Sequence, residues 1–156
     1  MPKTDKEITE QKYTDLMAAY RRIAPSCATQ AQAWRRVAES PAPRYYITHY
    51  QAYQRMLQMF RGDRKVREMS IYKKRLYESL YDTVIKLSQK REFLNMSLYQ
   101  ITQYAILEPA PSFFVSPTSM PRIFHEMKDL EKNKNRKFAT FYKENYIKRK
   151  NNDRKQ

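Results

Sequence analysis

Two copies of one proline-rich segment constrain this chain more than any other feature. Residues 40–48 read Ser-Pro-Ala-Pro-Arg-Tyr-Tyr-Ile-Thr, and residues 108–116, 68 positions later, read Glu-Pro-Ala-Pro-Ser-Phe-Phe-Val-Ser. Two prolines around one alanine hold the backbone extended and remove two amide donors, so neither copy can lie inside a helix. We therefore expect two stiff connectors, each anchored in a core by its aromatic pair and followed by a helix capped by Thr48 or Ser116.

The near absence of glycine favours an all-α protein. Gly62 is the one glycine among 156 residues. Tight hairpins and phosphate-cradling loops both rely on glycine, so the sequence disfavours both. Hydrophobic residues make up 41% of the chain, which is enough to bury a core over most of its length.

Capping residues mark the expected helix starts. A Thr or Ser followed three residues later by Glu or Gln forms a capping box, in which each side chain satisfies an exposed amide of the other residue. Four such pairs occur: Thr4 with Glu7, Thr29 with Gln32, Thr48 with Gln51, and Ser97 with Gln100. Apolar spacing then predicts helices over about residues 5–24, 29–40, 48–61, 69–90, 97–106 and 119–130.

The 68-residue offset extends beyond the proline motif. It also relates the caps Thr29 and Ser97, and three pairs of apolar positions: Tyr13 with Tyr81, Leu16 with Val84, and Met17 with Ile85. We therefore predict two tandem tri-helical, helix-turn-helix-like units at residues 1–66 and 67–130, each with a Pro-Ala-Pro connector. Residues 131–156 form a predicted basic C-terminal extension that is partly disordered.

Two finer expectations concern the connectors and the tail. If residues 45–47 and 113–115 pair as extended segments, they join the two units about a pseudo-two-fold axis. From residue 128 onward the chain has eleven Lys or Arg against four Asp or Glu. Residues 148–156 are therefore expected to lack structure when unbound.

The charge predicts a polyanionic partner. Thirty-one Lys and Arg against sixteen Asp and Glu give a net charge of +15, so the chain repels itself at low salt. Nucleic acid is the favoured partner, and a basic surface that only aids solubility or binds an acidic protein is the plainer alternative. No stretch is apolar enough to span a membrane. Cys27 is the one cysteine, and the N-terminus lacks an apolar signal core, so we expect a cytoplasmic protein.

The sequence offers no pattern typical of a catalytic or metal site. His49 and His125 are dispersed, and one cysteine with two histidines gives no zinc-ligand spacing. We therefore predict that the protein is not an enzyme and takes no cofactor. The thirteen tyrosines could stack on unpaired bases, but most fall on apolar helix faces, which favours core packing.

The candidate nucleic-acid contacts follow the helix-turn-helix analogy, in which the second helix enters the major groove. The candidate recognition helices are residues 48–61 and 119–128, and the alternative is that both are ordinary wet helix surfaces. Adding basic residues near the first connector and in the tail, the predicted contact residues are Arg35, Arg36, Arg44, His49, Gln51, Arg55, Arg61, Arg64, Lys65, Arg122, Lys148, Arg149 and Lys150.

The doubled motif, the Met-rich segment at residues 56–69 and the Lys73, Tyr77 and Glu78 helix start resemble a family of short basic proteins of unassigned function from Bacteroidales genomes, phages and mobile elements. The resemblance covers about residues 29–127. It implies a phage or mobile-element origin and supplies no functional residues.

These observations together favour a non-catalytic DNA-binding protein of a phage or mobile element, either a small regulator or a genome-associated architectural protein. The alternative is a structural component of a phage particle that contacts nucleic acid or an acidic protein, which would place the chain in the virion. An RNA-binding module is the third reading.

Overall fold

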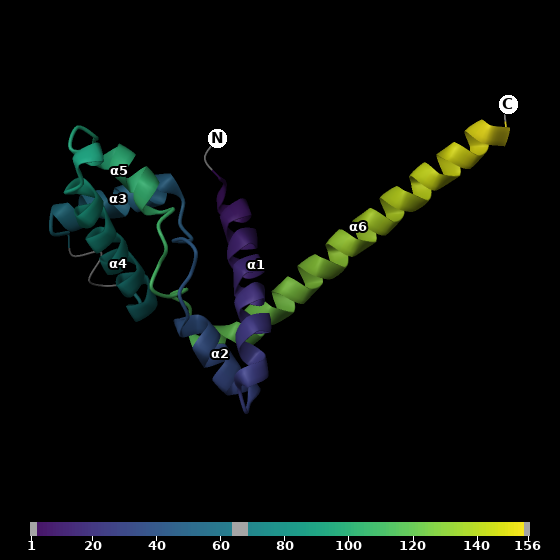
Figure 1. Ribbon diagram of the computed structural model, residues 1–156, viewed down its shortest axis with the longest axis horizontal. Helices are drawn as coiled ribbons and strands as arrows, with labels where there is room; N and C mark the ends of the chain where they lie inside the picture. The colour runs from purple at the N-terminus through teal and green to yellow at the C-terminus, as the bar shows by residue number, and fades with distance from the viewer. Residues whose placement is uncertain (1–2, 64–68, 155–156) are drawn as a thin grey trace. The chain divides into compact units, whose positions relative to one another are not determined.

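The computed structural model describes residues 3–63 and 69–154, with side chains described up to residue 136 and at 143, 144 and 148. Within these ranges the chain forms α-helices, short 3-10 turns and no β-strand, which confirms the predicted all-α class (Figure 1). The α-helices are α1 (Asp5–Ile23), α2 (Gln30–Glu39), α3 (His49–Phe60), α4 (Ile71–Ser88), α5 (Leu98–Ala105) and α6 (Met120–Arg154).

Local sequence explains the helix starts. At all four predicted caps the Thr or Ser hydroxyl accepts a hydrogen bond from the amide three residues on. The reciprocal capping box forms at Thr4 and at Ser97. At the second cap the Gln32 side chain accepts from the Ala28 amide instead, at 2.9 Å.

The last helix is longer than the sequence suggested. α6 begins at Met120, with Pro121 in its first turn, where the missing amide of a proline costs nothing. Neither proline nor glycine follows Pro121, so no local breaker ends the helix before Arg154. Residues 148–154 are therefore helical, where the sequence predicted a chain without structure.

The chain divides into two compact units, Met1–Met120 and Pro121–Gln156. Within the first unit, α1 packs on α2 and α4 packs on α5. α3 packs mainly against α4 and α5, although it follows α2 in the chain. Its residues Ala52 and Met56 are fully buried, so this contact forms part of the core. Helices on both sides of residues 64–68 therefore contribute to the Met1–Met120 unit.

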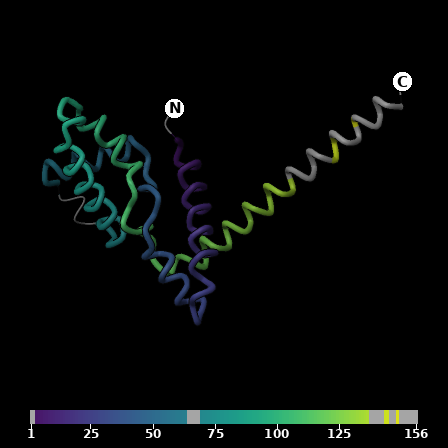
Figure 2. The backbone as a smooth tube through the Cα atoms, in the orientation of Figure 1, coloured from purple at the N-terminus to yellow at the C-terminus, as the bar shows by residue number. Residues whose placement is uncertain are grey.

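The two Pro-Ala-Pro connectors run side by side between the helices of this unit (Figure 2). Ala42 and Ala110 form an antiparallel bridge, in which the amide of each donates to the carbonyl of the other at 3.0 and 2.9 Å. Both alanines are 2% exposed. Because prolines flank each alanine, these are the only amides in the two Pro-Ala-Pro triplets that can pair.

The segments after the prolines do not pair through their backbones, so that expectation is wrong. The Tyr45 amide donates to the Ile106 carbonyl at 3.0 Å, and the Phe113 amide donates to the Ala38 carbonyl at 3.4 Å. Each amide therefore binds a carbonyl at the C-terminal end of a helix, where carbonyls lack partners within the helix. These two amides are therefore not available for hydrogen bonds between the two segments.

The aromatic rings after the two Pro-Ala-Pro segments contact one another. Tyr45 and Phe113 are 2% and 3% exposed. Tyr45 stacks on Phe114 with ring centroids 6.2 Å apart, and Tyr46 stacks on Phe113 at 5.8 Å. The connectors are therefore joined by ring stacking as well as by the alanine bridge.

Candidate nucleic-acid interface

The clearest basic surface begins on α2. Ala33 and Val37 bury one side of this helix, at 2% and 0% exposure. Arg35 and Arg36 lie on its exposed side. Among the described residues no carboxylate pairs with either guanidinium. Both charges are therefore available to an external anion.

α1 adds two arginines to the same pair of helices. Arg21 and Arg22 lie in its last turn, where cations stabilise the helix dipole, and both are exposed. Because α1 packs on α2, we treat the four side chains together as the α1–α2 arginines: Arg21, Arg22, Arg35 and Arg36. Neither Arg21 nor Arg22 is among the contacts predicted from the sequence, because the sequence does not show which helix α1 packs against.

The predicted recognition helix α3 has fewer side chains available to nucleic acid. Gln51 and Arg61 are exposed. Arg55 is half-buried, and its guanidinium donates to Gln58 Oε1 at 2.9 Å and lies 5.8 Å from the ring centroid of Tyr77 on α4. Arg55 therefore serves the packing of α3 on α4 in this structure.

Arg44 and His49, two of the predicted nucleic-acid contacts, are buried. Their exposed fractions are 7% and 9%. The Arg44 Nε donates to the Tyr45 carbonyl at 3.1 Å. The His49 Nε2 lies 2.6 Å from the Tyr99 carbonyl, which can only accept, so this nitrogen carries the proton. Neither side chain projects far enough to reach a base edge in a groove.

A half-buried pair, Tyr46 and Asp15, lies beside Arg44. The Tyr46 hydroxyl donates to Asp15 Oδ2 at 2.5 Å. Burial, followed by this hydrogen bond, raises the pKa of Tyr46 far above its usual value. Burial lowers the pKa of Arg44, against the opposing influence of Tyr46 and Asp15. Asp15 therefore accepts a hydrogen bond from Tyr46, and its negative charge partly offsets the positive charge of Arg44.

The stability of the protein is expected to fall above about pH 10 through Tyr46. A tyrosine in the unfolded chain loses its proton near pH 10, whereas the folded chain keeps the proton of Tyr46. The folded state then binds more protons, so the free energy of unfolding falls by up to about 1.4 kcal/mol per pH unit. Urea denaturation between about pH 9 and 11 measures this slope.

Tyr46→Phe removes the titrating group and should flatten that slope. Tyr50→Phe is the matched control, since Tyr50 is 67% exposed, and it should keep the wild-type slope. Equal slopes in both variants would show that Tyr46 is not the source.

The remaining predicted contact residues lie on α6 or outside the described positions. Arg122 and Lys148 are exposed on α6, and Arg122 forms an ion pair with Glu126 at 3.0 Å. Outside the description lie Arg64 and Lys65, together with the side chains of Arg149 and Lys150.

Aromatic pairs account for several of the tyrosines. Three ring pairs bring α3, α4 and α5 or their neighbouring turns together: Tyr53 with Tyr99 at 5.1 Å, Phe60 with Tyr81 at 4.9 Å, and Phe93 with Tyr104 at 5.4 Å. Tyr50, Tyr99 and Tyr104 are still 67%, 48% and 49% exposed. These three retain exposed surface that could contact an unpaired base.

Within the described residues, no three His, Cys, Asp or Glu side chains gather closely enough to hold a metal ion. No helix in residues 3–63 and 69–154 has an apolar stretch long enough to cross a bilayer. Comparison with protein-family models, with curated proteins and with solved structures found no match.

Proposed function

We propose that the protein binds duplex DNA without catalysis, as a genome-associated architectural protein or small regulator of a phage or mobile element. The observation that carries the proposal is a set of exposed cations, the α1–α2 arginines, on a chain with a net charge of +15. Cations that neutralise phosphates release condensed counterions, and this release supplies most of the affinity of non-specific binding. Of this net charge, +7 lies in residues 128–156.

The architectural role is favoured over reading of a specific sequence. Reading base edges requires polar side chains that project from an element into a groove. α3 is packed against α4 and α5, and two of its candidate contacts, His49 and Arg55, are engaged in protein contacts. We therefore expect less than about a tenfold preference for any duplex, far below the 10³-fold or more that is typical of specific binders.

We also infer that the chain arose by duplication of a tri-helical unit that includes its Pro-Ala-Pro connector. Contacts related by the 68-residue offset support this inference. The bond from Tyr45 to the Ile106 carbonyl has its counterpart from Phe113 to the Ala38 carbonyl, and the two ring stacks are related in the same way. The copies differ in charge, because α2 carries Arg35 and Arg36 whereas α5 has no Lys or Arg. The DNA-binding surface therefore belongs to one copy.

Replacing Arg35 and Arg36 together by glutamine is expected to weaken duplex binding by about tenfold at roughly 50 mM salt. The slope of log K against log salt should become shallower by about 2, because each lost phosphate contact contributes about 0.9. Fluorescence anisotropy with a random-sequence duplex carrying 5′-hydroxyl ends, at about 50–200 mM potassium chloride, measures both quantities.

The matched control is Lys86→Gln with Lys90→Gln, which removes the same charge from exposed positions at the other helix pair. We expect this variant to lose less than about threefold in affinity, since it retains the α1–α2 arginines. Equal losses in the two double variants would contradict localisation on α2. A wild-type protein that does not bind duplex at about 50 mM salt would contradict the proposal itself.

A further inference from the structure

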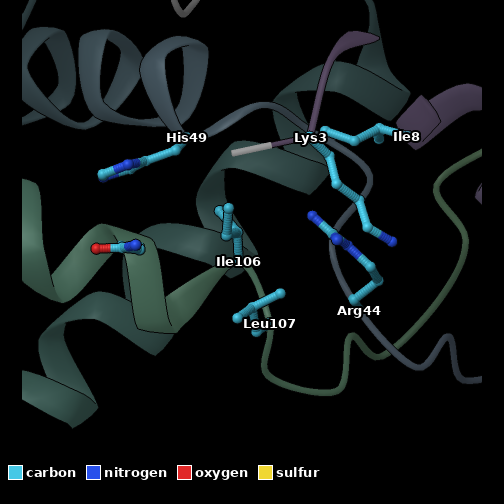
Figure 3. A pocket seen from close by; sticks show the side chains of 7 residues that line it. Lys3, Ile8, Arg44, His49, Ile106 and Leu107 are labelled. Atoms are coloured by element: carbon cyan, nitrogen blue, oxygen red, sulfur yellow. The ribbon is translucent and has the colours of Figure 1, made fainter. Parts of the chain in front are cut away.

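A cavity of about 330 Å³ opens beside the first connector, within the Met1–Met120 unit (Figure 3). Figure 3 shows the Lys3 and Arg44 side chains next to one another, with Ile106 and Leu107 close to them and His49 across the cavity from Arg44. The lining combines cationic, polar and apolar side chains: Lys3, Ile8, Arg44, His49, Gln103, Ile106 and Leu107. No Asp or Glu lines it. The cavity is thus positively charged on one side and apolar on another.

Arg44 is the central group of this cavity. It is 7% exposed, and its Nε is held by the Tyr45 carbonyl at 3.1 Å. No described residue accepts from its two terminal nitrogens, yet neither is sealed away from solvent. These nitrogens therefore open towards the cavity with their hydrogen bonds unused. A buried guanidinium normally has its donors paired, because an unpaired buried charge is costly.

A second, smaller cavity serves as an internal comparison. It measures about 100 Å³, and four of its lining residues lie 68 positions from lining residues of the larger one. The related pairs are Ala38 with Ile106, Glu39 with Leu107, Arg44 with Ser112, and His49 with Pro117. At the positions equivalent to Arg44 and His49 of the larger cavity, the smaller cavity has Ser112 and Pro117.

This comparison indicates that packing does not require the cations of the larger cavity. Ser112 follows the second Pro-Ala-Pro connector as Arg44 follows the first, and the second connector reaches its place in the core without a buried charge. Retaining Arg44 costs desolvation energy that Ser112 avoids. Asp15 offsets part of this cost, and a ligand that neutralises Arg44 would offset more of it.

We propose that the larger cavity binds a phosphate monoester that carries a small apolar group. The planar guanidinium of Arg44 can donate two parallel hydrogen bonds to phosphate oxygens, and Lys3 adds a second charge. Together they match the charge of nearly −2 on a phosphate monoester at pH 7, whereas a carboxylate carries only −1. Ile8, Ile106 and Leu107 supply an apolar wall for the rest of the ligand. A volume of about 330 Å³ lies at the small end of ligand pockets and suits about one ring besides the phosphate.

Phenyl phosphate is the probe, because it joins a phosphate monoester to one apolar ring. Added to the full-length protein labelled with ¹⁵N, it is expected to give saturable shifts of the Arg44 Nε–Hε signal and of the Ile106 and Leu107 amides. Inorganic phosphate should bind more weakly because it leaves the apolar wall uncovered, and phenol should give no saturable shift. The absence of saturable shifts with phenyl phosphate would overturn the proposal.

Three variants locate the site. Arg44→Gln should weaken binding by roughly 10-fold to 100-fold, the range for charge-assisted hydrogen bonds. Leu107→Glu is the alternative test if Arg44→Gln does not fold. It should leave the core intact, since Leu107 is 57% exposed, and it places a carboxylate that repels phosphate at the cavity. Arg75→Gln is the matched control, because Arg75 lines the smaller cavity, and it should leave binding unchanged. A loss in Arg75→Gln equal to that in Leu107→Glu would overturn the assignment.

The phosphate could belong to a free small molecule or to the end of a nucleic acid. Competition with 5′-phosphorylated and 5′-hydroxyl DNA 12-mers separates these sources. If only the phosphorylated strand displaces phenyl phosphate, the ligand is a nucleic-acid end. If neither strand displaces it, the ligand is a free phosphate ester. Both outcomes support a phosphate site in the cavity. Equal displacement by both strands would contradict a monoester site. The site goes beyond the proposed duplex binding, whose test uses duplexes with 5′-hydroxyl ends, so either proposal can fail without the other.

Discussion

Replacing Tyr45 with alanine is expected to lower the free energy of unfolding by about 3–5 kcal/mol, the usual cost of deleting a buried aromatic side chain. Tyr45 is 2% exposed, its amide binds the Ile106 carbonyl, and its ring stacks on Phe114. The substitution therefore opens a cavity where the two connectors cross. Since whole domains are stable by only about 5–15 kcal/mol, this change should remove a large fraction of the stability. Urea denaturation followed by circular dichroism measures the change.

Tyr45→Phe keeps the ring and removes only its hydroxyl, so it measures the contribution of the hydroxyl. That hydroxyl lies 2.7 Å from Ser79 Oγ and 3.0 Å from Thr83 Oγ1 on α4. Losing these hydrogen bonds should cost about 1 kcal/mol. Tyr50→Ala, at a site that is 67% exposed, should cost less than about 0.5 kcal/mol. If Tyr45→Ala costs no more than Tyr45→Phe, the ring is not part of the core described here.

The second large effect is expected from truncation after Met127. The deleted segment carries a net charge of +7 within residues 128–156. If about four of its cations contact phosphates, the slope of log K against log salt should become shallower by roughly 3–4. Affinity for duplex DNA at about 100 mM salt should fall at least tenfold, with no change in sequence preference, because phosphate contacts carry no direct sequence information. The anisotropy titration used for the α1–α2 arginines measures both changes.

A full-length variant tests whether charge alone explains the truncation. In it, the eleven Lys and Arg residues from Lys128 onward are replaced by glutamine, so the chain keeps its length. This variant should match the truncated protein in affinity and in salt slope. Unchanged binding by the truncated protein would refute a role for the segment, and unchanged binding by the glutamine variant would refute an electrostatic one.

Local rules predicted the secondary structure well. The hydroxyls of Thr4, Thr29, Thr48 and Ser97 cap helices because a cap needs only an amide three residues away. The prolines kept residues 41–43 and 109–111 out of helices for an equally local reason. The end of α6 was missed, since composition predicted disorder after residue 147 although no helix breaker is present.

Tertiary contacts decided what the candidate sites look like. Arg44 and His49 are polar residues next to a proline connector and a helix cap, a context that usually places a side chain at the surface. Their burial depends on α5 and its C-terminal end, about 50 to 60 residues away in the chain. The importance of Arg21 likewise depends on the packing of α1 against α2.

The sequence by itself determined that this protein is helical, where most helices start, that two extended connectors interrupt them, and that the surface is strongly basic. All of these properties arise from interactions within a few residues or from composition. Only the tertiary structure decided that Ala42 pairs with Ala110, that α3 packs against α4 and α5, and that Arg44 lines a cavity. Such contacts join residues far apart in the chain, and apolar periodicity shows which face of a helix is buried without showing what buries it.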